Sequence, residues 1–209
     1  TPCIEQAKAY VEENGFEVMV FHATGTGGKT MEALIDAGFF AGVLDLTTTE
    51  YCDEVVGGIL AAGPDRCGAA IRQKVPQVVS VGACDMVNFG EMDSVPEQFR
   101  GRNLYKHNPA VTLMRTTVEE NVEIAHRLAE KWNGARRKMV LLLPKKGVSM
   151  IDAEGQPFDG PEERKTLFEA LKKEIRNDNV EIVELDNNIN DEHFALTAAK
   201  TILELMADQ

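Results

Sequence analysis

Short apolar segments rich in β-branched residues alternate along the chain with longer stretches in which apolar residues recur at helical spacing. This alternation predicts parallel βαβ units. Segments such as 139–143 are apolar throughout, which is typical of strands that helices cover on both faces of a sheet. We therefore predict an α/β fold, a three-layer, doubly wound, Rossmann-like domain with a five-stranded, mainly parallel sheet. The predicted strands cover residues 17–21, 41–46, 77–82, 138–143 and 180–185.

The chain shows no internal repeat and no linker rich in proline, glycine or serine, so residues 1–209 are predicted to form a single domain. A helix is predicted over 112–132, where apolar residues recur at helical spacing until Asn133 and Gly134 end it. The connection before that helix, residues 83–111, is longer than most loops in compact domains. We expect it to be a functional or mobile loop.

The net charge and the spacing of the cysteines exclude several classes of binding partner and site. With 22 basic and 34 acidic residues, the formal net charge is −12, which opposes nonspecific attraction to nucleic acid and to anionic membranes. No apolar run reaches the roughly 20 residues of a membrane-spanning helix, and the amino end lacks a secretory signal pattern. The four cysteines form no C-x-x-C pair. The sequence predicts a cytoplasmic protein without a cysteine-based metal site, binding neither nucleic acid nor membrane.

A glycine loop follows the first predicted strand. Residues 22–30 read His-Ala-Thr-Gly-Thr-Gly-Gly-Lys-Thr and lead into a helix. A helix start leaves backbone N–H groups unpaired and favours negative charge, and glycines let a ligand approach the main chain closely. The segment nearly matches the phosphate loop G-x-x-x-x-G-K-[ST], but Ala23 replaces its first glycine. The candidate ligand-binding residues here are Thr24, Gly25, Thr26, Gly27, Gly28, Lys29 and Thr30.

A second interpretation of this loop stays open, in which the glycines only let a strand turn tightly into a helix. Polar residues at other strand ends favour a site, because open parallel sheets bind ligands outside the carboxyl ends of their strands. We add Asp45 and Thr47 at the second strand and Lys146 and Ser149 after the fourth. The expected cofactor is ATP or another phosphorylated ligand.

Two carboxylates and a histidine have alternative roles. Asp45 and Asp85 either hold Mg²⁺ beside a bound phosphate, or cap neighbouring helices, or accept hydrogen bonds from ribose hydroxyls. His107 lies in the long connection, where an imidazole titrates near neutrality. If the chain is an enzyme, His107 is the candidate proton carrier and Asp85 the residue that orients it; otherwise His107 is an ordinary surface residue.

Several separate motifs, in order along the chain, resemble a known family. Together they look like the carboxyl-terminal half of the uncharacterised family typified by the tomato mosaic virus resistance protein. The resemblance covers essentially the whole chain and implies a longer protein with two Rossmann-like halves, of which this is the second, and an ATP-binding-like domain. The motifs are Phe21–Gly28, Leu44–Thr48, Asp85–Phe89, His107–Pro109 and Lys146–Asp152.

Three functions follow from these observations. The first is binding of a phosphorylated or nucleotide-like small molecule at the glycine loop. The second is an enzyme acting on a small carboxylate or acyl substrate, with the loop holding the oxyanion. The third is a domain that assembles with the amino-terminal half of the same protein or with a second copy, as a homo-oligomer.

Overall fold

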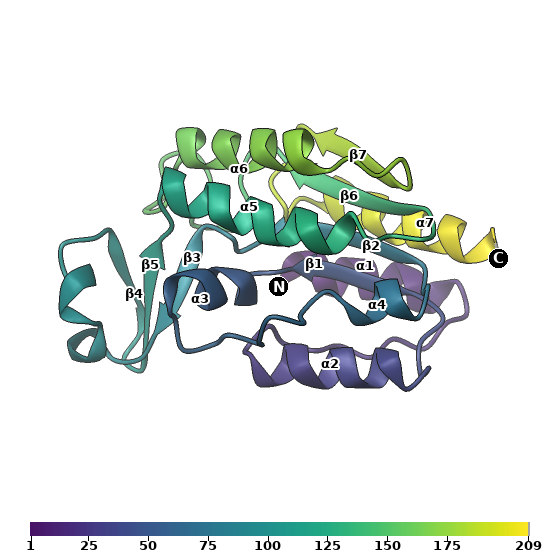
Figure 1. Cartoon of the computed structure of the whole chain (residues 1–209), viewed down its shortest axis with the longest axis horizontal. Helices are drawn as coiled ribbons and strands as arrows, with labels where there is room; N and C mark the ends of the chain where they lie inside the picture. Colours follow the sequence, from purple (N-terminus) through teal and green to yellow (C-terminus); the bar gives the residue numbers. More distant parts are fainter. Residues whose placement is uncertain (209) are drawn as a thin grey trace.

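The computed structural model describes residues 1–208, and its centre is a parallel sheet of four strands. The strand order is β1-β2-β6-β7, and each neighbouring pair is parallel (Figure 1). β2 and β6 are buried along their whole length. Four of the five predicted strands are therefore confirmed, as β1 (Val43–Thr47), β2 (Gln77–Gly82), β6 (Met139–Pro144) and β7 (Val180–Leu185).

The fifth predicted strand, residues 17–21, is wrong for this structure. The segment runs between α1 (Pro2–Glu13) and α2 (Thr26–Asp36) without forming a strand. No backbone hydrogen bond joins residues 16–22 to β1 in the described part of the chain, and Met19 is 59% exposed. The apolar, β-branched composition that predicted a strand is present, but the hydrogen-bonding partner is not.

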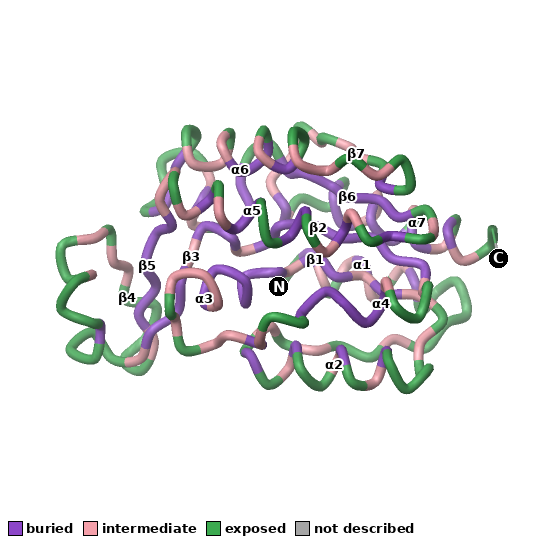
Figure 2. The backbone as a smooth tube through the Cα atoms, in the orientation of Figure 1, coloured by how far each residue is buried: buried purple, intermediate pink, exposed green. Residues whose placement is uncertain are grey.

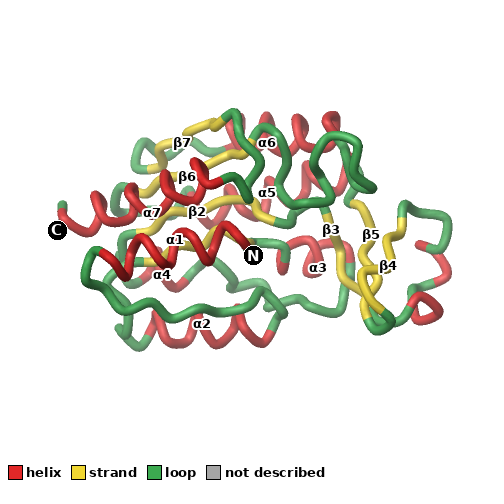
Figure 3. Tube along the Cα trace, turned by 180° about the vertical axis from the view of Figure 1, so that it is seen from behind, coloured by secondary structure: helices red, strands yellow, loops and turns green. Residues whose placement is uncertain are grey.

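Helices cover both faces of the sheet, which confirms the layered α/β arrangement (Figures 1 and 3). α1 and α7 (Glu192–Ala207) pack on one face, against a cluster that includes Val78, Val140 and Leu142. The opposite face, with Val79 and Leu141, packs against α3 (Glu50–Val56), α5 (Val118–Trp132) and α6 (Pro161–Glu174). Successive strand residues thus point into two separate cores, as the pleat of a strand requires.

A small antiparallel sheet stands where the sequence predicts a long loop. Its order is β3-β5-β4, with β3 (Met86–Phe89), β4 (Leu104–Asn108) and β5 (Val111–Arg115). Two short 3₁₀ helices, η1 (Met92–Ser94) and η2 (Glu97–Phe99), precede β4. Segment 83–111 is therefore largely ordered structure, and Figure 2 shows its β4 side mostly exposed.

The helix predicted over 112–132 begins six residues later than expected, at Val118. Residues 112–115 pair with β3 and β4 instead, and they are buried. The helix start is fixed by a capping box, in which Thr117 Oγ1 accepts from the Glu120 N–H and the Glu120 carboxylate accepts from the Thr117 N–H. The remaining helix is α4 (Ala69–Arg72). Among residues 1–208, none of the helices combines the length and apolar character that crossing a bilayer requires.

Candidate functional site

The glycine loop binds a carboxylate that belongs to the chain itself. The N–H groups of Gly25 and Gly28 both donate to Oε2 of Glu50, at 2.6 and 3.2 Å. Glu50 is the first residue of α3, and its side chain is fully buried. The loop therefore has the geometry of an anion site, and an internal anion fills the position that the sequence assigns to a ligand.

Close packing explains why this loop needs glycine. Gly25 has a φ of +82°, which side chains other than glycine rarely adopt. A Cβ on Gly27 would lie 1.8 Å from the carbonyl oxygen of His22, and a Cβ on Gly28 would lie 2.3 Å from both carboxylate oxygens of Glu50. The glycines therefore serve the turn and the close approach of an anion at the same time, which are the two interpretations that the sequence leaves open.

The other predicted loop residues have different surroundings. Thr24 N–H donates to His22 O, and Thr30 Oγ1 donates back to Thr26 O within the helix. Lys29 is exposed. The N–H groups of Thr26 and Gly27 make no hydrogen bond within the described residues, so they remain available as donors. Among the described residues, Lys29 and Thr30 make neither a side-chain hydrogen bond nor an ion pair with the Glu50 carboxylate.

Arg66 connects this loop to a buried cluster of carboxylates. Its Nε donates to Glu50 Oε1 at 2.8 Å, and its Nη2 donates to Asp45 Oδ1 at 2.7 Å. Its Nη1 also bonds Asp45 and reaches Glu32 Oε1 at 3.2 Å. The Arg66 side chain is only 3% exposed. One guanidinium thus compensates three carboxylates that are largely shielded from water.

The environment shifts several pKa values in this cluster. Burial and then the Asp45 charge raise the pKa of Glu32. Burial is the largest single effect on Arg66 and opposes its charged form, but the charges of Asp45 and Cys67 and the hydrogen bonds to Asp45 and Glu50 together outweigh it and raise the pKa of Arg66. Burial likewise raises the pKa of Cys67, so this thiol is an unreactive one. Three acidic side chains therefore face one cation, and burial disfavours the charged form of Glu32 among them.

The cluster also brings Glu32, Asp45 and Cys67 close enough to share a metal ion, with one ligand atom of each within 4.8 Å of the others. Arg66 Nη1 contacts all three of these residues, at 3.2 Å from Glu32 Oε1 and 3.4 Å from Cys67 Sγ. A positive charge is already present at the place that a cation would take. The arrangement is that of an ion-pair network around Arg66.

A groove opens beside this cluster. It holds about 410 Å³ and is lined by residues of β1, α1, α7 and the loop that joins α1 to α2. Its polar lining includes His22, Gly28, Asp45, Glu50 and Arg66. The rest of its lining is mainly apolar, with side chains from the α1–α2 loop, β1 and α7. Thr47 also lines the groove, and its carbonyl oxygen accepts from Arg66 Nη2 at 3.3 Å.

Asp85 and Ser149 lie in a second buried cluster at the ends of β2 and β6. Ser149 Oγ donates to Asp85 Oδ2 at 2.7 Å, while Asp85 Oδ1 has no hydrogen-bond partner in the described structure. Burial, and then the charge of Asp152, raise the pKa of Asp85 to about 7. Asp152 pairs with Arg115 and Arg164. These contacts hold the β3–β5 sheet against the loop that follows β6.

The structure does not gather all the predicted site residues in one place. Asp85, Lys146 and Ser149 do not line the groove, and Lys146 pairs with Asp186 at the surface. Asp45 is held by Arg66, and Asp85 by Ser149, so the two carboxylates do not share a partner as a Mg²⁺ pair would. Of the predicted site residues, only Gly28, Asp45 and Thr47 line the groove.

His107 and Asp85 are also apart. His107 is exposed near the end of β4, where Asn108 pairs with Val111. Asp85 lies at the other end of β5, since its carbonyl oxygen accepts from the Thr116 N–H. The length of β5 separates them, roughly 15 Å at about 3.4 Å per residue. The structure therefore does not form the pair that the enzyme hypothesis requires.

Sequence reasoning missed Glu32, Glu50 and Arg66. For Glu32 a signal existed, since it shares the buried face of α2 with Gly28 and Ile35, and a carboxylate on such a face needs a buried partner. Nothing in the sequence alone indicates that a residue 22 positions after Gly28 supplies the anion.

Fold and site together define an α/β domain with an open parallel sheet and a glycine loop whose amides hold a carboxylate. The chain belongs to the uncharacterised protein family UPF0261, whose C-terminal domain matches residues 1–206. The family resemblance predicted from the sequence is thereby confirmed.

Three relatives illustrate the range of the family. A UPF0261 protein of Clostridium tetani is 58% identical over 99% of this chain and 51% of its own length. A UPF0261 protein of Rhizobium meliloti is 48% identical over 95% of this chain and 50% of its own length. The tomato ToMV resistance protein Tm-1(GCR237) is 44% identical over 98% of this chain and 27% of its own length. The chain thus spans at most about half of these relatives and corresponds to a C-terminal domain of a larger protein.

Proposed function

We propose that this domain binds a small phosphorylated or nucleotide-like molecule, with the anionic group at the glycine loop and the remainder in the groove. The observation that carries this proposal is the pair of hydrogen bonds from Gly25 and Gly28 to one carboxylate oxygen of Glu50. Backbone amides that converge on one anionic oxygen are the donors that a phosphate oxygen needs.

In this proposal Glu50 is the internal substitute for the ligand's anionic group. Carboxylate and phosphate oxygens accept the same hydrogen bonds, and Glu50 lines the groove through which a ligand would enter. A phosphate that displaces Glu50 would also find the two unpaired N–H groups of Thr26 and Gly27, and Arg66 close by. The affinity for a ligand would then depend on how much more strongly its anionic group accepts hydrogen bonds from these amides than the Glu50 carboxylate does. We therefore expect the site to select groups that carry more negative charge than a carboxylate.

The groove supplies room for the rest of such a ligand. Its 410 Å³ falls within the roughly 300–1,000 Å³ typical of small-molecule sites, and an apolar body with a few polar groups at one end is the usual composition of such sites. An apolar wall beside an anion-binding loop suits a ligand with a flat or aliphatic part attached to phosphate. This is the reason to prefer a nucleotide-like molecule over a bare anion.

Calorimetric and thermal-shift titrations with ATP, ADP and inorganic phosphate test this proposal. We expect saturable heat and a raised midpoint of unfolding with ATP or ADP, and a weaker effect with inorganic phosphate. Gly28→Ala should abolish both signals, because its Cβ would lie where the oxygens of the bound anion approach. Gly101→Ala is the matched control, since a Cβ there meets no atom within 4 Å. If none of the three compounds gives heat or a thermal shift, the proposal is wrong.

The enzyme alternative is not favoured by this geometry, because His107 and Asp85 lie at opposite ends of β5. Assembly with another half of the protein is favoured by a different feature, the open edge of β1.

A further inference from the structure

β1 is an edge strand whose outer side pairs with no strand in the described part of the chain. The sheet order places β2 on its other side. Val43 N–H donates to Pro76 O on the β2 side, and since alternate residues of a strand point their amides to opposite sides, Leu44 directs its N–H and C=O to the open edge. Folded proteins usually cover, shorten or charge such edges, because an open edge recruits another strand.

The residues beside this edge are apolar, and they are not the charged residues or prolines that usually prevent pairing at an open edge. Four large apolar side chains that line the groove are exposed, with Met19 at 59% and Phe39 at 69%. We call these four the apolar rim; they are Phe16, Met19, Val20 and Phe39. No lysine or proline lies on β1 itself, whose sequence is Val-Leu-Asp-Leu-Thr. An open edge with an apolar rim is the combination that marks a surface made to be covered.

We infer that the other half of the longer protein docks on this surface, by adding an extended apolar segment to the sheet beside β1 and covering the apolar rim. The length of the related proteins indicates that the docking partner is the other half of the same protein. The bacterial relatives carry about as much chain again as is present here, and residues 1–206 match the C-terminal domain of the family. Thr1, to which a preceding half would be joined, lines the same groove.

The groove beside β1 is long enough along the strand to take an added strand. The α1–α2 loop runs beside β1 across the groove (Figure 3), and both continue to the same end, where Gly28 and Glu50 meet. An inserted strand would pair its backbone with Leu44 and bury side chains against Met19 and Val20, as in other cases of β-strand addition. The docked segment would then occupy the apolar length of the groove, so that in the full-length protein only the end at Gly28 and Glu50 would stay open to a ligand. This inference concerns the protein's own two halves and does not depend on the proposed ligand.

Photo-crosslinking in the full-length protein that contains this chain tests the docking. A benzophenone amino acid replaces Phe39, which is exposed and tolerates a larger ring, and a matched sample carries it at Ile59, which is 63% exposed and lies outside the groove. We expect irradiation to join position 39 to peptides of the other half and position 59 to none of them. Crosslinks from position 39 only within residues 1–209, or between two copies of the chain, would overturn the inference.

Amide hydrogen exchange of the same full-length protein gives an independent readout. We expect the Leu44 amide to exchange slowly, and about tenfold faster in the double variant Met19→Glu with Phe39→Glu. The control pair Ile59→Glu with Met150→Glu introduces the same charges at side chains that are 63% and 66% exposed elsewhere, and it should leave the rate unchanged. Fast exchange at Leu44 in the unmodified protein, or equal effects of the two pairs, would overturn the inference.

Discussion

Removing the internal anion gives the sharpest test of how the glycine loop works. In Glu50→Ala the N–H groups of Gly25 and Gly28 and the Nε of Arg66 lose their acceptor. Breaking a buried ion pair from one side costs about 3–5 kcal/mol. Because Asp45 and Glu32 still compensate Arg66, we expect the lower figure, about 3 kcal/mol. For a chain of this size, that loss lowers the unfolding midpoint by about 6–12 °C.

The loss should be reversed by small anions in solution. If the vacated position is an anion site, formate, acetate or inorganic phosphate should bind there and stabilise the variant. Ligand at a hundred times its dissociation constant returns about 2.7 kcal/mol. The assay is the unfolding midpoint against anion concentration, with chloride at equal ionic strength as the reference. Glu50→Gln, which keeps the shape but not the charge, should lose about 1–2 kcal/mol and show no rescue.

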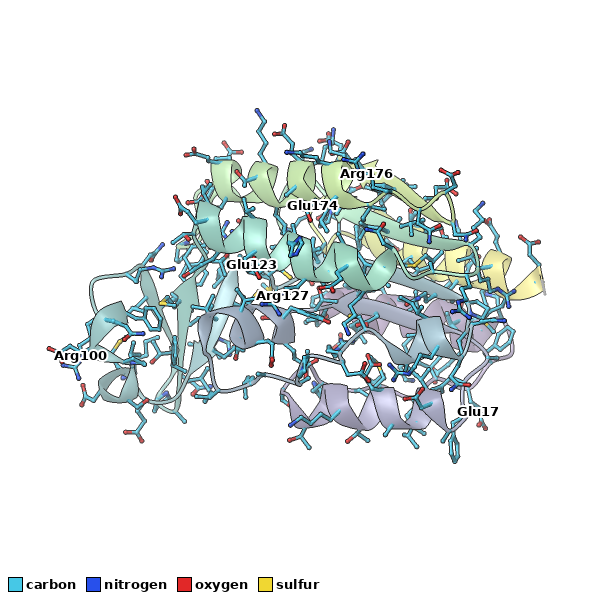
Figure 4. The ribbon with its side chains drawn as sticks, in the orientation of Figure 1. Glu17, Arg100, Glu123, Arg127, Glu174 and Arg176 are labelled. Atoms are coloured by element: carbon cyan, nitrogen blue, oxygen red, sulfur yellow. The ribbon has the colours of Figure 1, made fainter. Side chains whose placement is uncertain are left out.

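A matched control exists on α5. Glu123 Oε1 accepts from Arg127 Nε at 2.7 Å, nearly the same contact that Glu50 makes with Arg66, but at the surface. Figure 4 shows this pair on α5, well away from α2. Glu123→Ala should therefore leave stability nearly unchanged and respond to formate as it does to chloride. If Glu50→Ala behaves the same way, the loop does not bind anions and the reasoning fails.

Three further outcomes follow from the structure. Gly27→Ala should lower the free energy of unfolding, measured with a chemical denaturant, by at least about 2–3 kcal/mol, because its Cβ would clash with His22 O. Gly101→Ala, the control, should change that free energy by no more than about 0.5 kcal/mol. Arg66→Met should lower the free energy of unfolding by at least about 3–5 kcal/mol, because it leaves buried carboxylates without a cation. A smaller loss would mean that these carboxyl groups are protonated in the folded protein. The Asp85 pKa of about 7 lies above its usual value of 3.8. Between about pH 4 and pH 7 the folded state therefore binds more protons than the unfolded state. The free energy of unfolding should then fall as the pH rises from about 4 to 7, by up to about 1.4 kcal/mol per pH unit. Asp85→Asn should flatten that part of the profile, and an unchanged slope would show that Asp85 does not titrate there.

Much of the sheet could be predicted from sequence because its strands are apolar along their whole length. Segments such as 139–143 have no polar face to place in water, so a strand covered on both sides is their most favourable state. The segment 17–21 shows the limit of that reasoning. It is nearly as apolar, but strand formation also needs a hydrogen-bonding neighbour, and within residues 1–208 no backbone hydrogen bond joins this segment to the open edge of β1.

The small antiparallel sheet was missed for a related reason. Val111–Arg115 lies next to a strong helical pattern, and its apolar residues continue that pattern by chance. Only the long-range pairing with Met86–Phe89 separates strand from helix. In the same way, the glycine loop could be recognised as an anion site, but its anion could not be found, because Glu50 at the start of α3 reaches the loop only through the tertiary fold. Tertiary contacts of this kind leave little trace in a single sequence.

The central claim is that Gly25 and Gly28 form an anion site which Glu50 fills when no ligand is bound. Proton and nitrogen NMR shifts of these two amides measure it directly, because an N–H that donates to a carboxylate resonates far downfield. The account predicts downfield amide protons in the unmodified protein, an upfield change in Glu50→Ala, and a return downfield when inorganic phosphate is added to that variant. Amide shifts that do not respond to the loss of Glu50, or to phosphate after its loss, would contradict the account.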